Sequence, residues 1–262
     1  MAARAIWKGR IAFGSVDVPV KLYSAVQDRG VSFRLLDAKK KAPVRQQMVD
    51  PGSGEVVETA QVRRAFEVEP GELVILEEEE LAELEPEPSR EIEITRFVPP
   101  TQITHQWYDR PYYLGPDGDE EGYFALAAAL REKGREGVAR WVMRKKEYVG
   151  ALRADGDYLM LITLRRAGEV IPASALRPPG GRDLDEREVE MAKQLVAAME
   201  EEELDFAAFR DEYRERVLEL VEAKAAGKVV KFPQAPKRDT ERDLADVLEK
   251  SLAAAGKARK SA

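Results

Sequence analysis

The stretch VARWVMRKKEYVGALRADGDYLMLITLRR, residues 138–166, decides the fold. Side chains alternate between the two faces of a strand, so its first part separates into an apolar face and a cationic face. The apolar face carries Ala139, Trp141 and Met143, and the other carries Arg140, Val142 and Arg144. Asp155-Gly156 favours the positive φ angles of a tight turn, and residues 158–164 are apolar on both faces, as in a strand buried on both sides. The stretch therefore predicts a core β-hairpin with a positively charged exposed face, which suits an extended polyanion such as nucleic acid.

Most of the first 177 residues is predicted to form β-structure, so the fold class is mixed and mainly β. Alternation predicts two strands within residues 6–23. Further strands are expected at residues 31–36, 62–68, 73–76, 92–94 and 110–116, with the short strand at 73–76 buried. Helical spacing predicts an acidic helical turn at 77–84 and a helix over 119–133 that ends at Gly134.

The last third of the chain is predicted to be helical. A hinge at residues 178–182, PPGGR, precedes a helix that begins near Asp183, where Asp183 and Glu186 have the spacing of a capping box. A second helix is expected over 205–226, with Gly227 after its end. The apolar stripes of these helices favour packing and dimerisation, and they include Leu195, Val196, Phe209, Tyr213 and Val217. The chain thus divides into a core at 1–177, a helical arm at 178–228, and a linker with a short helix and a basic tail at 229–262.

Charge is segregated along the chain, although the net charge is −7. Residues 1–50 hold ten Lys and Arg against four acids, and residues 131–166 hold ten against five. Residues 55–93 instead hold fourteen acids against three bases, and residues 182–222 hold fifteen against six. The local charge of a surface patch decides which molecules the patch attracts. Basic residues clustered around a β core therefore favour contacts with the phosphates of duplex nucleic acid, and such contacts do not depend on the base sequence.

The sequence lacks the residues that several kinds of catalytic and metal site require. The chain has no cysteine and a single histidine, His105, which excludes disulfides and thiolate chemistry and argues against a zinc site or a catalytic triad. Four successive carboxylates at residues 77–80 point around a short helix and cannot converge on one ion. No phosphate-binding glycine loop, membrane span or signal peptide is apparent, so we expect a cytoplasmic protein without metal or cofactor.

Four segments together resemble the prokaryotic Ku proteins of non-homologous end joining. They are AIWKGRIAFGSVDVPVKLY at 5–23, RPYYLGP at 110–116, ARWVMRKKEYVGALRADGDYLML at 139–161, and the arm segment from VEMAKQLVAAM at 189–199 to FRDEYRERVLELVEAKAAGK at 209–228. The resemblance implies a β-barrel core with a long strand excursion, about residues 31–66, that forms half of a bridge around DNA. Two subunits would close a ring through their helical arms, and linear double-stranded DNA would thread through it at the nucleoid. An ATP-dependent DNA ligase, ligase D, would be recruited through the C-terminal region.

The resemblance also assigns candidate residues. The candidate phosphate contacts are Lys21, Arg34, Lys39, Lys40, Lys41, Arg45, Arg63 and Arg64, with Arg140, Arg144, Lys145 and Lys146 lining the cradle. The narrow apolar stripe of a predicted helix at 240–254 would bind the ligase, through Leu244, Val247, Leu248 and Leu252. Many relatives have a cysteine pair in the bridge, whereas residues 49–54 here read VDPGSG, so metal binding is not transferred.

Two other functions remain open from the residues alone. The carboxylates between residues 77 and 119 could belong to a metal-dependent nuclease, which would degrade labelled linear duplex when Mg²⁺ or Mn²⁺ is added. A pure assembly module would bind no DNA at all. The non-catalytic clamp is the interpretation that the basic core and the resemblance both favour.

Overall fold

The computed structural model describes residues 4–176 and 185–228, together with Leu248 and Ser251. The chain forms two compact units. The first comprises Met1–Arg29 and Phe33–Ala175, and the second comprises Gly30–Ser32 and Leu176–Ala262.

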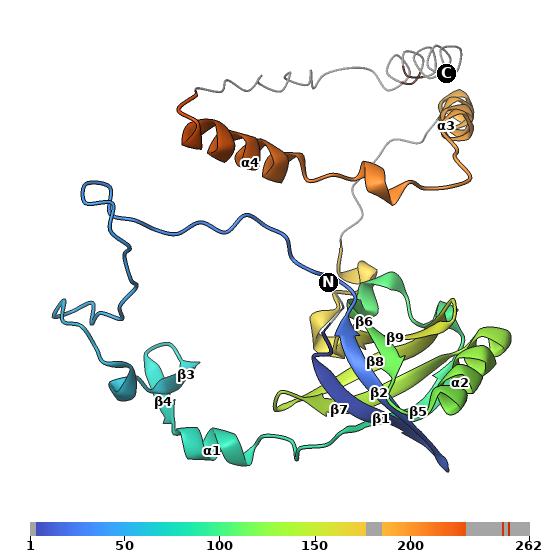
Figure 1. Cartoon of the computed structure of the whole chain (residues 1–262), viewed down its shortest axis with the longest axis horizontal. Coiled ribbons are helices and arrows are strands. Elements are labelled where there is room, and N and C mark those ends of the chain that lie inside the picture. The colour runs from blue at the N-terminus through green and yellow to red at the C-terminus, as the bar shows by residue number, and fades with distance from the viewer. Residues whose placement is uncertain (1–3, 177–184, 229–247, 249–250, 252–262) are drawn as a thin grey trace. The chain divides into compact units, whose positions relative to one another are not determined.

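The first unit is built on a closed barrel of seven strands in the order β1-β2-β6-β9-β8-β7-β5 (Figure 1). The strands are β1 (Trp7–Phe13), β2 (Val16–Ser24), β5 (Glu91–Val98), β6 (Tyr108–Pro116), β7 (Glu136–Met143), β8 (Lys146–Asp155) and β9 (Tyr158–Leu164). All neighbours are antiparallel except β1 and β5, whose parallel pairing over Arg10–Ala12 closes the barrel. The predicted β-barrel core is therefore confirmed.

The hairpin at residues 138–166 lies in the barrel wall, as predicted. Ala139, Trp141 and Met143 are buried in the core, while Arg140 is exposed. Gly156 has a φ of 59° in the β8–β9 turn. The expectation that both faces of β9 are buried was too strong, because Leu159 and Leu161 are fully buried but Tyr158 is 58% exposed.

Helix α2 (Glu120–Lys133) joins β6 to β7 and packs its buried face on the barrel. It begins at Asp119, whose carboxylate accepts from the N–H of Gly122, and ends at Gly134 in the left-handed conformation, as predicted. The buried hydroxyl of Tyr123 donates to the carbonyl of Leu114 at 2.5 Å and accepts from a β9 backbone N–H at 2.8 Å. These bonds satisfy a polar group inside the core and fix the helix across two strands.

The segment that leaves the barrel after β2 and returns to it at β5 is residues 25–90, which extend on both sides of the predicted 31–66; we call residues 25–90 the excursion from here on. They contain β3 (Arg64–Glu69), β4 (Glu72–Leu76) and α1 (Glu78–Glu83), which confirms a strand near 62–68 and a helical turn at 77–84. The expected strand at 31–36 was wrong. Those residues form only an isolated bridge, Leu36↔Pro43, around a turn whose N–H groups at Lys39 and Lys40 bond to the side chain of Asp37.

The expected burial of β4 was also wrong. Leu73 and Ile75 are 63% and 58% exposed, because β3 and β4 form a two-stranded sheet without a third strand. Short 3₁₀ helices complete this unit, at Thr59–Gln61, Pro100–Gln102, His105–Trp107, Ala167–Glu169 and Ala173–Ala175.

The second unit contains α3 (Glu186–Ala198), a 3₁₀ turn (Phe206–Ala208) and α4 (Glu212–Ala225). The predicted capping box was misplaced, because Asp185 and Glu188 form it and α3 begins after Asp185. The predicted continuous helix over 205–226 is interrupted, because Asp211 accepts from the N–H of Arg214 and starts α4 anew. In the predicted helix at 240–254, Leu248 and Ser251 are helical, whereas Leu244, Val247 and Leu252 lie outside the described residues.

Candidate nucleic-acid interface

The excursion leaves and returns at one end of the barrel. The N–H of Ala25 donates to the carbonyl of Pro111 at 3.3 Å, and the carbonyl of Arg90 accepts from Arg10 at 2.8 Å. The β7–β8 turn lies at the same end, because β7 is antiparallel to β5 and finishes where β5 begins. We call this end the basic rim, after Arg110, Arg144, Lys145, Lys146, Arg165 and Arg166. The opposite end carries α2.

The β7–β8 turn consists of two basic residues in an unusual conformation. Met143 pairs with Lys146, so Arg144 and Lys145 alone form the loop, with φ angles of 52° and 63°. Two-residue hairpin loops of this kind prefer Asn and Gly, because other side chains crowd the backbone at positive φ. Strained backbone is found most often at functional sites, where the residue type matters more than stability.

Most of the predicted phosphate contacts carry free charges. Within the described part of the chain, no carboxylate or other hydrogen-bond acceptor holds the exposed side chains of Arg34, Lys39, Lys40, Lys41, Arg45, Arg64, Arg140, Arg144 and Lys146. Five of these nine lie on the excursion before β3, one begins β3, and three lie on β7, its turn and the start of β8. A cation without a carboxylate partner can meet a phosphate without first breaking an ion pair.

Three of the predicted contacts are instead held by carboxylates. Lys21 lies 2.6 Å from Asp117, which also binds Lys8 at 3.0 Å. The hydrogen bond from Lys21 is the main reason that the pKa of Asp117 falls below its ordinary value. Arg63 lies 3.3 Å from Glu77, and Lys145 lies 3.0 Å from Glu85, which follows α1. The sequence could not show these pairs, since each joins residues far apart in the chain.

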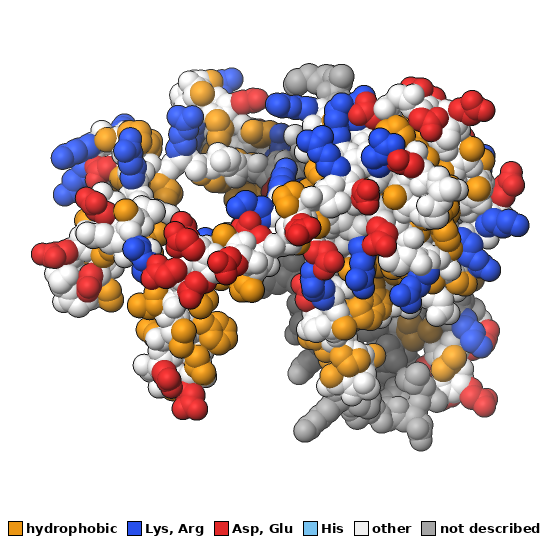
Figure 2. All heavy atoms as spheres, turned by 90° about the horizontal axis from the view of Figure 1, so that it is seen from below, with side chains coloured by type: hydrophobic (Ala, Val, Ile, Leu, Met, Phe, Trp, Pro, Cys, Tyr) orange, Lys and Arg blue, Asp and Glu red, His pale blue; other side chains and the backbone are white. Residues whose placement is uncertain are grey.

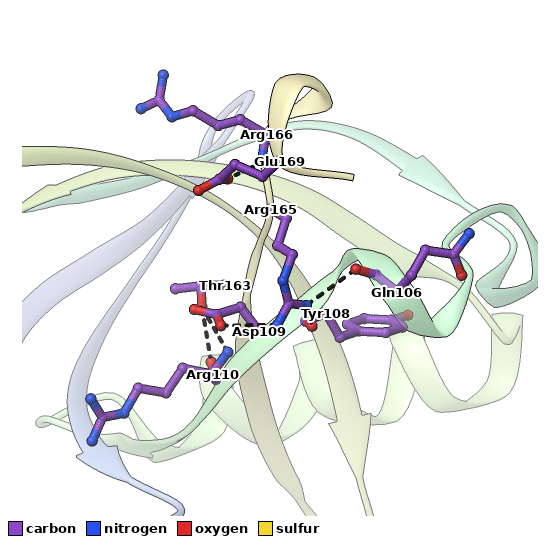
Figure 3. Close-up of polar contacts among 8 residues, drawn as sticks. All are labelled: Gln106, Tyr108, Asp109, Arg110, Thr163, Arg165, Arg166 and Glu169. Carbon is purple, nitrogen blue, oxygen red and sulfur yellow. Dashed lines mark hydrogen bonds and ion pairs between the residues drawn. The ribbon is translucent and has the colours of Figure 1, made fainter. Parts of the chain in front are cut away.

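A β-bulge places an arginine that the sequence analysis missed. Between the pairs Tyr108↔Leu164 and Pro111↔Ile162, two residues of β6 oppose Thr163 alone. The Thr163 hydroxyl accepts from the N–H of Arg110 at 2.9 Å and lies 3.2 Å from a carboxylate oxygen of Asp109 (Figure 3). The guanidinium of Arg110 points away from this cluster. Pro111 within a strand was the available signal, since proline in a sheet often marks a bulge.

Arg165 and Arg166 are used to hold this end of the barrel together. Arg165 donates to the carbonyls of Gln106, at 3.1 Å, and Tyr108, and its Nη2 lies 3.3 Å from Asp109 (Figure 3). The backbone N–H of Arg166 donates to the carboxylate of Glu169 at 2.6 Å. Arg165 is therefore a structural clamp, because Nη1 and Nη2 of its guanidinium are both engaged within the barrel.

The described residues lend no support to the nuclease alternative. Among them, no three His, Asp or Glu side chains gather as a metal site would require. The carboxylates of Glu77 and Glu85 face cations instead of one another. In the same part of the chain, no helix combines the length and apolarity needed to cross a membrane.

Comparison with known proteins identifies the family. A family model described as the Ku70/Ku80 beta-barrel domain matches residues 12–206. This chain belongs to the Ku family. A protein of Geotalea uraniireducens named "Non-homologous end joining protein Ku 2" is 37% identical over 254 residues, which are 96% of this chain and 98% of that protein. "Non-homologous end joining protein Ku" of Mycolicibacterium smegmatis is 37% identical over 98% of this chain and 83% of its own length. The archaeal protein of that name from Archaeoglobus fulgidus is 33% identical over 96% of this chain and 99% of its own length.

The resemblance seen in the sequence is thus confirmed at the level of family and fold. The Ku family match begins within β1 and extends past α3, so it covers the whole excursion. The roles of individual cations, the domain limits and the ligase-binding segment stay predictions.

Proposed function

We propose that this Ku chain binds the ends of double-stranded DNA in non-homologous end joining, without catalysis and without reading sequence. The names of its relatives support the process. The observation that carries the proposal is a set of cations, on the excursion and on the barrel end from which the excursion leaves, that have no ion-pair partner among the residues that the structure describes. Such side chains contact phosphates, which are the same at every base pair.

We further propose a homodimer that closes a ring around the duplex. The β3–β4 hairpin supports a protein partner, because a two-stranded sheet is marginal alone and this one exposes apolar side chains (Figure 2). Phe66 is 66% exposed and Leu73 is 63% exposed. In the second unit, the exposed fractions of Val196, Phe209 and Tyr213 are 70%, 72% and 68%. Such exposed apolar side chains are what an arm that packs on another subunit would require. Sedimentation equilibrium should give the mass of a dimer, and a monomer at micromolar concentration would refute the ring.

Salt dependence tests the phosphate contacts. The slope of log K against log salt is about −0.9 for each phosphate neutralised. With about four to eight contacts in a dimer, a fourfold rise in salt should weaken binding to a short linear duplex by roughly two to four decades. Covalently closed plasmid is the control for end entry, and cut plasmid should be bound much more tightly. An affinity for duplex that does not change with salt concentration, or equal binding of closed and cut plasmid, would contradict the proposal.

The C-terminal segment is proposed to recruit an ATP-dependent DNA ligase of the ligase D type. Its apolar stripe is narrow, and isolated helices shorter than about 15 residues are marginal, which fits a segment that folds on a partner. Truncation after Gly227 should preserve DNA binding and abolish stimulation of the ligase. A truncated protein that still stimulates the ligase would refute this role.

A further inference from the structure

Two turns of the excursion, residues 35–44 and 48–57, are built on the same backbone hydrogen bonds. In both, the N–H of the last residue donates to the carbonyl of the first, at 3.1 Å in the first turn and 2.9 Å in the second. An isolated β-bridge lies one residue further in, again in both turns. The sequences LLDAKKKAPV and MVDPGSGEVV share only an aspartate and the final valine, so the repeat is one of conformation and cannot be read from the sequence.

The shared aspartate, Asp37 or Asp50, starts the tight part of each turn. Its N–H donates to the carbonyl five residues further on, at 2.8 and 2.9 Å, and its carbonyl accepts from the N–H four residues further on, at 2.8 Å in both turns. The residue at that fourth position is left-handed, with φ angles of 54° at Lys41 and 76° at Gly54. The two turns therefore have the same backbone path, although lysine adopts this conformation at a cost and glycine does not.

The aspartate side chain closes each turn a second time. Oδ1 of Asp37 accepts from the N–H groups two and three residues further on, at 3.0 and 2.5 Å. Oδ1 of Asp50 accepts from the same two positions at 2.7 and 3.1 Å. The bonds from Ser53 and Gly52 hold the pKa of the Asp50 carboxyl below its ordinary value, so this group stays an anion at neutral pH. In each turn, two backbone N–H groups thus converge on one carboxylate oxygen.

Metal-binding knuckles with two cysteines use the same frame. Their thiolates lie three residues apart, as C-x₂-C, and N–H groups of the turn donate to the first sulfur. The equivalent positions here are Asp37 and Lys40 in the first turn and Asp50 and Ser53 in the second. The carboxylate therefore receives the N–H groups that a metal-bound thiolate would receive.

These four residues do not fit a metal. Lysine carries an ammonium that repels cations, and a serine hydroxyl is a poor substitute for a thiolate on zinc. Within the described ranges, no three His, Asp or Glu side chains gather as metal ligands. The cysteine pair that many relatives carry in the bridge implies a metal there, so this chain differs from those relatives in what holds the turns.

We propose that Asp37 and Asp50 stand in the place of metal-bound thiolates and keep both turns in the knuckle conformation without a metal. The carboxylate supplies the negative charge on which the N–H groups converge, and it requires neither zinc nor a reduced thiol. Both aspartates thus fix the conformation of these turns. This inference goes beyond DNA binding and can be tested without DNA.

The first test puts thiolates at the ligand positions of the full-length protein. The variant Asp37→Cys/Lys40→Cys places them in phase with the turn N–H groups. Lys39→Cys/Ala42→Cys is the matched control, because it has the same spacing, also removes one lysine and changes exposed residues. The chain has no cysteine of its own, so thiolate-to-metal absorption during titration with Cd²⁺ reports these pairs alone. The first pair should bind Cd²⁺ about 10–100-fold more tightly, the usual effect of hydrogen bonds to a metal ligand, and equal affinities would overturn the knuckle geometry.

The second test measures the cap itself by amide hydrogen exchange. Asp37→Ala and Asp50→Ala should each speed exchange of the two N–H groups that the carboxylate receives by about tenfold, because a hydrogen bond to a charged group is lost. Glu55→Ala is the control, since its carboxylate has no hydrogen bond or ion pair among the described residues. Exchange rates that match the control would refute the role of the aspartates. In the wild-type protein EDTA should leave these rates unchanged, and faster exchange after EDTA, or one zinc ion bound per chain, would refute the metal-free conformation.

Discussion

Replacing Arg144-Lys145 by Asn-Gly should make the barrel more stable and its DNA binding weaker. The two residues occupy a loop that requires positive φ at both positions, with observed values of 52° and 63°. Asn-Gly is the pair that this turn geometry prefers, whereas arginine and lysine adopt it at a cost. The substitution therefore removes strain and two positive charges at once.

The expected stability gain follows from three contributions. Relief of the left-handed conformation at both positions is about 2–3 kcal/mol. The greater freedom of glycine in the unfolded chain offsets about 1 kcal/mol of this. Removal of the exposed Lys145–Glu85 pair costs a few tenths of a kcal/mol at most. The free energy of unfolding should thus rise by about 1–2 kcal/mol, with the melting temperature rising by about 2–4 °C for each kcal/mol.

Urea unfolding followed by tryptophan fluorescence measures the first effect, since Trp7, Trp107 and Trp141 all belong to the first unit. Gel shift of a linear duplex across salt concentrations measures the second, and the slope should fall by about 0.9 for each phosphate that the variant no longer neutralises. An Ala-Ala variant at the same positions is the control, because it removes the charges and keeps the strain. Unchanged stability of the Asn-Gly variant would refute the strain, and unchanged binding would refute the phosphate contacts.

Two further predictions concern single side chains. Tyr108→Phe should destabilise the barrel by about 1–3 kcal/mol, because the Tyr108 hydroxyl bonds at 2.7 Å to the buried carboxylate of Glu136. Burial and this bond raise the pKa of Tyr108 to about 12, so the folded state keeps a proton that the unfolded state loses. The free energy of unfolding should therefore fall more steeply between pH 10 and about pH 12 in the wild type than in the variant, which keeps the raised pKa values of Tyr112 and Tyr123. Glu85→Gln should release Lys145 and tighten DNA binding a few-fold, whereas Glu87→Gln in the same segment should do so less because Glu87 has no ion-pair partner among the described residues. Equal effects of the two glutamate variants would show that total charge alone matters.

The barrel could be predicted from the sequence because its alternating apolar side chains are buried by residues of the same unit. Trp141 is 2% exposed and Ile11 is fully buried, and both lie where alternation placed them. The same reasoning failed at residues 31–36, where Phe33 and Leu35 alternate as a strand would but are 63% and 65% exposed. An alternating pattern shows which side chains favour burial and does not show whether the covering surface belongs to the same chain.

The candidate phosphate contacts were harder to predict, because availability of a charge depends on partners that are distant in sequence. Lys21 and Lys146 look equivalent in the sequence, yet Lys21 is held by Asp117 and Lys146 has no partner among the described residues. Arg110 follows Asp109 directly, so the local charge in the sequence is zero. The fold directs that carboxylate to Thr163 and Arg165, and Arg110 has no ion-pair partner in the described part of the chain. Ion pairs with carboxylates reduce the net attraction for phosphate, so free cations should dominate the salt slope and paired ones should add little. The affinity of this chain for DNA is then set by where its excess of acids is placed, which explains how a protein of net charge −7 can present a basic rim.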